Sequence, residues 1–523
     1  MSVTSRAAFA GAIAISCAVA AVAAGAAATS IIWVAETDLP AYIGQPWKPF
    51  PLPPVRPPQN PSMAANPFNN VHNDTWMSDT YDIPGPLGLQ PFTITSTLAP
   101  ARRSPDTPSF VCGTLTFDSR GRIITPCYGP GEASLVLLDP ASLEVLAYRQ
   151  LPLAADATAA YGSAYMYLDD QDRAIVTQTN KLQVFSVTEE SGKAEFAPGP
   201  EYDLTDYVGA SDAIQSVIPD WGGRLWFVVR KAGTVGVLDP ATGAVGYLTL
   251  NEEIANSFAV NGNDAYIVTT QAMYRLTAGA DGVPRQVWRA PNYKNLNIKK
   301  DGQLSPGSGT TPTLLDNGRY VAIADNDSQM HVVVYRTAEP LQPNEERLVC
   351  EAAVFPPGAG ATEDSLIGVG RSLIVANEYG YTVDLAAGPV PQSTPTVPGV
   401  ARVDIDANGK GCRVVWSNDS VAAPQVAPKM STKNGLIYLF TRKYDPATLR
   451  DDGSNLDVWY WTAMDFRTGA VVWETLVGTG GRFDSWVPGP ALGPDETLYV
   501  GAYGGMVATR DAELARRTAV VGR

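Results

Sequence analysis

The stretch AMDFRTGAVVWETL, residues 463–476, decides the fold class of this chain. It recurs as VLDPATGAVGYLTL at 237–250 and, more loosely, as LLDPASLEVLAYRQL at 137–151. In the two closer copies Asp and Thr can bond turn amides, Gly supplies a positive φ, and an aromatic residue follows on the next strand. We expect each copy to be a hairpin between two strands, with its aromatic side chain in the core.

The hairpins belong to a longer repeat. Around them the chain runs in one order: an apolar strand, a Gly/Asp turn, a second strand, another turn and then the hairpin. Units of this kind begin near residues 109, 162, 215, 255, 308, 362, 425 and 487. A spacing of roughly 50 residues is that of a four-stranded propeller blade with insertions. We therefore predict an all-β fold, an eight-bladed β-propeller of four-stranded blades, with seven blades as the alternative count.

The last unit, 486–511, ends without a fourth strand. Open strand edges promote aggregation, so a propeller with a short final blade is commonly closed by a strand from the other terminus. PFTITSTLA at 91–99 is the segment that we expect to close the ring. The propeller would then occupy residues 71–511, followed by a polar tail at 512–523.

Composition agrees with this class and excludes others. Only 17% of the residues are charged, while Gly and Pro number 47 and 42. Long surface helices are rich in charge, so this balance disfavours a helical protein. The net charge of −15 argues against a nucleic-acid partner, because such proteins neutralise phosphates with Lys and Arg.

The N-terminus is typical of an export segment. An uncharged, Ala-rich run follows Arg6 and reaches the small residues Ala26-Ala27-Ala28, the arrangement of a signal peptide with its cleavage site. The apolar sequence then continues to Ala35, which makes it long enough to span a bilayer. We expect residues 1–35 to be either a signal peptide or a signal-anchor helix. The protein would then be extracytoplasmic: secreted or periplasmic, or attached to the membrane through this segment alone.

Ten prolines lie between residues 40 and 67. Proline lacks a backbone donor and favours extended polyproline II, so residues 36–70 are predicted to be an extended tether outside the propeller.

Four cysteines lie beyond the leader: Cys112, Cys127, Cys350 and Cys412. In an exported chain an even number permits two disulfides. Cys112 and Cys127 flank a predicted hairpin, so we expect them to face each other on paired strands. No pair has CxxC spacing, which argues against a zinc site.

The A-x-D-x-x-T-G-x-x-x-W pattern at 463–473, with the unit ALGPDETLYVGAYGGMVATRD at 491–511, resembles the repeats of the pyrroloquinoline-quinone-like propellers, the quinoprotein alcohol dehydrogenase-like superfamily. The pattern is degenerate at 237–247, and the other blades match in outline. The resemblance implies the fold, not a cofactor. Quinone-binding members carry an adjacent Cys pair that this chain lacks, so we do not expect pyrroloquinoline quinone here. Non-catalytic relatives include an exported assembly scaffold.

Polar residues recur where the inner strands should begin, as in Asn256-Ser257-Phe258 and Glu363-Asp364-Ser365, and in turns expected on the same face. Ca²⁺ takes six to eight oxygen ligands, so oxygens from several blades converging on the axis suit it. We predict an acidic central funnel with Ca²⁺ as its cofactor, held by Asn256, Glu363, Asp364, Asn377 and Glu378, with Asp325 near the rim. The alternative is ordinary turn chemistry, since Asp and Asn bond their own backbone in turns.

Histidine is scarce, with only His72 and His331 in the chain. We assign His72 to the leader before the first blade. His331 is then the candidate base of a catalytic site, with Glu363 and Asp364 as candidate acids. The alternative for His331 is an exposed residue at a strand start. The motifs GxSxG, HExxH and GxxxxGK[ST] are absent.

Two functions are compatible with these features. The first is an exported binding or scaffold module that presents one face to an envelope protein or a small-molecule ligand. The second is an enzyme working from the funnel, either a Ca²⁺-assisted hydrolase or lyase or a quinone-dependent dehydrogenase without the Cys pair. The most basic stretch, 290–309, is a further candidate contact for a partner or an anionic head group.

Overall fold

The computed structural model is built almost wholly of strands. It describes residues 32–33, 39–53, 56–95, 111–129, 132–152, 164–291, 293–381, 396–424, 426–443, 448–449, 457–485, 489–503 and 505–512. The complete helical elements in these ranges are two short 3₁₀ turns, Thr205–Tyr207 and Gly481–Phe483.

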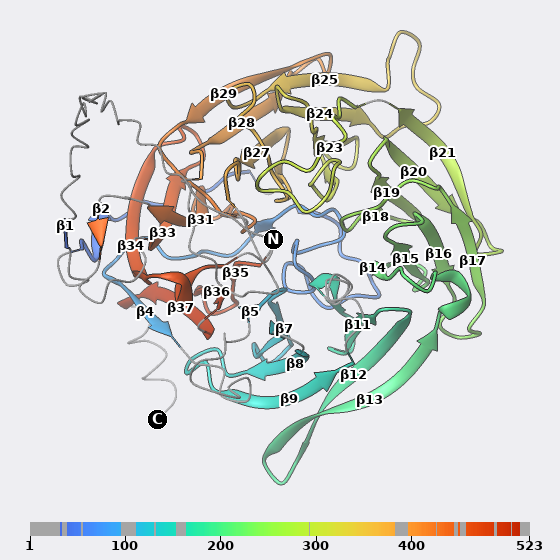
Figure 1. Ribbon diagram of the computed structural model, residues 1–523, viewed down its shortest axis with the longest axis horizontal. Coiled ribbons are helices and arrows are strands. Elements are labelled where there is room, and N and C mark those ends of the chain that lie inside the picture. The colour runs from blue at the N-terminus through green and yellow to red at the C-terminus, as the bar shows by residue number, and fades with distance from the viewer. Residues whose placement is uncertain are drawn as a thin grey trace, which may run out of the picture.

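Eight sheets stand side by side in a ring around a central axis (Figure 1). Blade one consists of β5 (Val111–Cys112), β6 (Thr116–Phe117), β7 (Ile123–Gly129), β8 (Glu132–Leu138) and β9 (Val145–Leu151), and blade two of β10 (Tyr167–Leu168), β11 (Ala174–Gln178), β12 (Lys181–Glu190) and β13 (Lys193–Asp203). Blade three consists of β14 (Ile214–Pro219), β15 (Leu225–Val229), β16 (Thr234–Leu238) and β17 (Val245–Thr249), and blade four of β18 (Ala259–Asn261), β19 (Asp264–Val268), β20 (Ala272–Ala278) and β21 (Pro284–Pro291).

Blades five to eight complete the ring. Blade five consists of β22 (Thr313–Leu315), β23 (Tyr320–Ala324), β24 (His331–Arg336) and β25 (Leu348–Ala353), and blade six of β26 (Ile367–Val369), β27 (Ser372–Ala376), β28 (Val400–Ile405) and β29 (Cys412–Asn418). Blade seven consists of β30 (Lys429–Ser431), β31 (Leu436–Lys443), β33 (Val458–Asp465) and β34 (Val471–Thr479), and it also includes β2 (Tyr42–Gly44) and β3 (Thr80–Tyr81). Blade eight consists of β35 (Ala491–Leu492), β36 (Leu498–Ala502), β37 (Gly505–Asp511) and β4 (Pro91–Thr95). A separate pair joins β1 (Ile32–Trp33) to β32 (Thr448–Leu449).

The predicted fold class and blade count are confirmed. Each blade is an antiparallel meander that runs outward from the axis, and buried aliphatic and aromatic side chains fill the space between blades. Because the meander alternates direction, the loops before the inner strands and those between second and third strands share one face of the ring. We call this the start face, and the opposite one the end face.

The predicted closing strand is also confirmed. β4 pairs antiparallel with β37, from Thr95 opposite Val507 to Pro91 opposite Asp511. The Asp511 carboxylate accepts the amides of Leu87 and Leu89 at 2.8 and 2.9 Å, so the end of the last blade also fixes the approach to β4. The edge that a three-stranded blade would expose is therefore covered.

The hairpins form as predicted, but one of their aromatic residues is placed differently. In the copy between β33 and β34 Trp473 is fully buried, whereas in the copy between β16 and β17 Tyr247 is 54% exposed. β34 is covered by β2, whose Gly44 lies opposite Trp473, while β17 is the outermost strand of its blade. The expected core position therefore holds only where an additional strand covers the hairpin.

Both expected disulfides are present. Cys112 and Cys127 are direct partners on β5 and β7 and are bonded to each other. Cys350 on β25 is bonded to Cys412 on β29, which joins the outer strands of blades five and six.

The proline-rich segment differs from the expected tether. β2 pairs with β34, and the amides of Phe50 and Leu52 donate to the carbonyls of Asn434 and Thr432 at 3.0 and 2.9 Å. Residues between the prolines supply the donors that proline lacks, so residues 42–52 pack on blade seven.

Apart from Ile32 and Trp33 of β1, the expected leader lies outside the described residues, as does most of the polar tail. Within the part of the chain that is described, no helix has the length and apolar character needed to cross a bilayer.

Candidate functional site

Residues 60–81, here called the axial segment, lie within the ring and contact the inner strands (Figure 1). Inner-strand amides of six blades donate to its carbonyls at 2.7–3.1 Å: Phe117 to Phe68, Leu168 to Asn69, Val260 to Thr75, Leu314 to Trp76, Gly368 to Ser78 and Met430 to Asp79. The Asn60 side-chain amide reaches the Pro219 carbonyl of blade three at 2.8 Å. The axial segment thus satisfies inner-strand edge groups that would otherwise face the axis.

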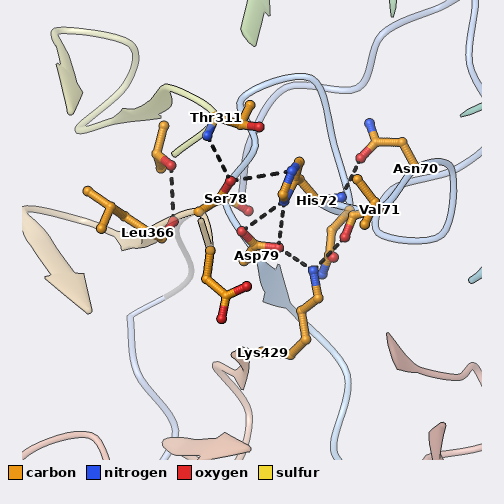
Figure 2. Close-up of polar contacts among 12 residues, drawn as sticks. Asn70, Val71, His72, Ser78, Asp79, Thr311, Leu366 and Lys429 are labelled. Atoms are coloured by element: carbon orange, nitrogen blue, oxygen red, sulfur yellow. Dashed lines mark hydrogen bonds and ion pairs between the residues drawn. The ribbon is translucent and has the colours of Figure 1, made fainter. Parts of the chain in front are cut away.

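A chain of polar contacts joins the axial segment to blades five, six and seven (Figure 2). His72 Nδ1 lies 3.1 Å from an Asp79 carboxylate oxygen, and its Nε2 lies 3.3 Å from Ser365 Oγ. Ser365 Oγ in turn accepts the Thr311 amide at 3.2 Å. At the other end Lys429 Nζ donates to Asp79 and to the Val71 carbonyl.

The order Ser365, His72, Asp79 is that of a nucleophile, a base and an orienting acid. However, Ser365 and His72 are only 3% and 1% exposed, and Lys429 occupies the Asp79 carboxylate. The arrangement can hold three parts of the ring together, but in this conformation a substrate cannot contact Ser365 directly. His72 is therefore part of the propeller core, and its assignment to the leader before the first blade is wrong.

Three of the predicted metal ligands, Glu363, Asp364 and Glu378, lie together in blade six. One oxygen of Glu378 accepts the Thr362 hydroxyl at 2.8 Å and the amides of Glu363 and Asp364 at 3.0 and 2.9 Å. Glu363 Oε1 accepts the Leu304 amide at 2.6 Å. All three carboxyls are buried, so they do not line an open funnel.

Burial is the main influence on these acids. It raises the pKa of Glu363 to about 8 and that of Glu378 to about 7, with Glu378 adding repulsion at Glu363. The pKa of Asp364 is raised well above its usual range by burial and then by the Glu378 charge. A charged carboxylate in a dry interior needs donors or a cation, and the neutral form is otherwise favoured.

Asn256 and Asn377 have structural roles. Asn256 accepts the Tyr165 hydroxyl at 2.9 Å and donates to the Gly309 carbonyl and, at 3.5 Å, to Glu363. Asn377 accepts the amides of Ala361 and Tyr379 at 3.1 and 3.2 Å. Each amide oxygen therefore already serves protein donors.

Asp325 belongs to a different cluster, with Asp327 and His331. Within the described residues these three form the one group of acidic and His side chains whose ligand atoms all lie within 4.8 Å of one another. His331 donates its amide to Asp325 at 2.7 Å and places Nδ1 2.8 Å from the same carboxylate. Burial raises the pKa of Asp325 to about 6. The predicted six-residue set thus divides into separate groups, and His331 is buried at its strand start.

Sequence reasoning missed His72, Asp79 and Lys429. The sequence Asn70-Val71-His72-Asn73-Asp74 contained a signal. Short polar side chains follow one another there, without the mixture of charged residues that a solvated linker usually has. Such a run suits a buried hydrogen-bonded segment better than a tether.

No protein-family model matches the chain. A protein of uncharacterised function from Archaeoglobus fulgidus is 27% identical over 334 residues, which are 58% of this chain and 62% of that protein. The match thus spans less than two thirds of that relative.

Two solved structures are similar to this chain at low sequence identity. BamB from Moraxella catarrhalis is 12% identical, with 80% of this chain and 95% of BamB covered and a TM-score of 0.43. Chaetomium thermophilum Sqt1, solved with the N-terminus of ribosomal protein L10, is 12% identical, with 75% and 94% covered and a TM-score of 0.46. These likenesses concern the fold alone.

Proposed function

We propose that this protein is a PQQ-like β-propeller that acts outside the cytoplasm as a non-catalytic binding or scaffold module for a protein partner. The observation that carries the proposal is the occupation of the axis by the chain itself. The axial segment bonds to blades one to seven, and the acids expected to line a funnel are buried. Recognition is therefore assigned to the loops of a face rather than to the centre.

The loop at residues 293–300, on the start face, is the surface that we favour. Leu296 and Ile298 are 43% and 54% exposed. The Leu296 amide donates to the Asn326 carbonyl at 3.0 Å, and the Asn326 side-chain amide donates to the Ile298 carbonyl at 2.9 Å. These hydrogen bonds already hold the loop backbone in one conformation, so binding a partner costs less conformational entropy than it would for a flexible loop. Exposed apolar side chains on such a loop are well suited to an interface.

The lysines of this loop argue for a protein rather than an anionic lipid. Lys294 pairs with Glu351 at 3.0 Å, and Lys300 donates to the carbonyls of Asp327 and Gly360. Binding to anionic lipid head groups depends on several unpaired cations, and two of the three lysines in this loop, Lys294 and Lys300, already have partners.

An extracytoplasmic location is supported by the disulfides Cys112–Cys127 and Cys350–Cys412, since structural disulfides persist in oxidising compartments. The Ala-rich N-terminal run supports it independently.

Site-specific photo-crosslinking in the producing cell tests the proposal. A crosslinking amino acid at Ile298 should yield a discrete protein adduct, whereas the same amino acid at Trp221, an exposed end-face residue, should not. The double variant Leu296→Ser, Ile298→Ser should fail to compete for that adduct, and Tyr247→Ser should compete normally. Equal adducts from both faces, or full competition by the double variant, would refute the proposed binding surface.

A further inference from the structure

The carboxyls of Asp364 and Glu378 form a buried pair in blade six. Asp364 lies just before β26, and Glu378 just after β27. One Glu378 oxygen accepts three hydrogen bonds, but the other, Oε2, accepts none from the described residues. Neither oxygen of Asp364 accepts a bond from a described donor either. The two side chains are close enough to share a hydrogen bond, and three of their oxygens have no other donor among the described residues, although buried acceptors require donors.

The charges that face this pair do not balance it. Glu363 adds a third carboxyl from the same turn, and Asp79 adds a carboxylate from the axial segment. Lys429 of blade seven is the positive group that acts on Asp364, but its ammonium already bonds Asp79 and the Val71 carbonyl. Acids therefore outnumber the cation on the elements packed around Asp364 and Glu378.

A shared proton is an incomplete solution for this pair. A proton between Asp364 and Glu378 engages two of the three oxygens and leaves one without a partner. A hard cation can be bound by all three, since Ca²⁺ takes six to eight oxygen ligands and accepts bidentate carboxylates and water. The amide oxygens of Asn256 and Asn377 are not needed, because each already accepts protein donors.

We propose that Asp364 and Glu378 bind a structural divalent cation, with Ca²⁺ as the fitting ion, at the junction of blade six and the axial segment. This site uses fewer residues than the funnel site expected from the sequence. Glu363 lies beside it, but its Oε1 already accepts the amides of Leu304 and Ser305. Asp325 lies in its own cluster with His331. The inference does not depend on the identity of any protein partner.

The test is metal analysis and Ca²⁺ titration of the purified full chain, before and after treatment with a chelator. We expect a single Ca²⁺ per chain, and a thermal midpoint that falls on chelation and returns with Ca²⁺. Asp364→Asn and Glu378→Gln should each weaken Ca²⁺ binding by about tenfold or more. The matched control, Asp325→Asn, removes another buried acid and should leave the affinity unchanged.

Acidity provides a second readout on the unmodified protein. Both carboxyls must be ionised to bind the metal, so affinity should be higher at mildly alkaline pH than at acidic pH. Absence of Ca²⁺ binding by the unmodified chain at the higher pH would overturn the inference, even if the variants fail to fold. Unchanged affinity in folded Asp364→Asn and Glu378→Gln would overturn it as well.

Discussion

The ammonium group of Lys429, in the inner strand of blade seven, donates to the carboxylate of Asp79 in the axial segment, 350 residues away in the sequence. Both side chains are almost fully buried. Asp79 also contacts His72 and thereby connects to Ser365 of blade six. One ion pair thus joins the chain's early residues to its seventh blade at the centre of the ring.

Lys429→Met should destabilise the protein strongly. The substitution keeps the apolar stem but leaves the Asp79 carboxylate buried beside a single His, and breaking one side of a buried pair costs about 3–5 kcal/mol. Urea unfolding followed by tryptophan fluorescence measures the change. Lys181→Met removes a lysine that is paired with Glu201 at the surface, where both side chains are exposed, and should cost about 1 kcal/mol or less. Equal losses in the two variants would contradict the role given to Asp79 and Lys429.

The two disulfides should differ in their contributions to stability. Cys112–Cys127 closes a loop with a sequence separation of 15, and Cys350–Cys412 one with a separation of 62. In the chain-entropy model the loss on removal is about 3 kcal/mol for the shorter loop and about 4 kcal/mol for the longer one. Denaturation of the two double Cys→Ser variants checks the order, and a larger loss for the shorter loop would contradict it.

Two hairpin glycines provide a matched pair for the cost of positive φ. Gly243 and Gly469 have φ of 75° and 71°, but an added Cβ meets open space at Gly243 and the Trp416 ring at Gly469. Gly243→Ala should cost about 1 kcal/mol for the left-handed backbone. Gly469→Ala should cost about 1–3 kcal/mol more, because the ring must move. Thermal unfolding of both variants measures the difference, and equal costs would show that the Trp416 contact is easily relieved.

Without bound metal, the protein should lose stability as the pH rises from about 4 to about 8. Burial raises the pKa of Asp74 to about 7 and that of Glu363 to about 8 in the folded chain. The folded state therefore holds protons that the unfolded chain releases near pH 4, and the stabilisation present at low pH disappears as these groups ionise. Urea midpoints across this range, in chelator, measure the slope.

Glu363→Gln is the control for this dependence. The amide cannot ionise, so the slope should become shallower throughout about pH 5 to about pH 8, where Glu363 is ionised in the unfolded chain but protonated in the folded chain. A slope that is unchanged by Glu363→Gln would assign the dependence to other buried acids.

Local sequence determined the parts of the fold that could be predicted. The hairpin around Asp465 forms from contacts within a few residues, such as the Gly469 amide to the Asp465 carbonyl at 2.8 Å, so its pattern is visible in the sequence. The closing strand followed from the need to cover an edge. By contrast, the sequence of the axial segment shows no repeated pattern that would predict its conformation. Its conformation depends on inner-strand amides such as Val260 and Gly368, which lie far away in the sequence.

The candidate site was predicted only in part for a related reason. Composition and spacing brought Glu363, Asp364 and Glu378 together correctly, because they flank neighbouring strands of one blade. Whether an amide such as Asn377 is available as a ligand depends on which backbone donors reach it, and those contacts are set by loop conformation.

Hydrogen exchange at the axis tests the central claim most directly, namely that residues 60–81 are an integral part of the propeller. Val260, Leu314 and Gly368 donate their amides to this segment, and the Ala64 amide donates to Leu168 of blade two. These four amides should exchange as slowly as those in the middle strands of the blades, because all open only when the ring opens. Fast exchange at Ala64 and at the three inner-strand amides, in a chain whose middle strands stay protected, would contradict the account.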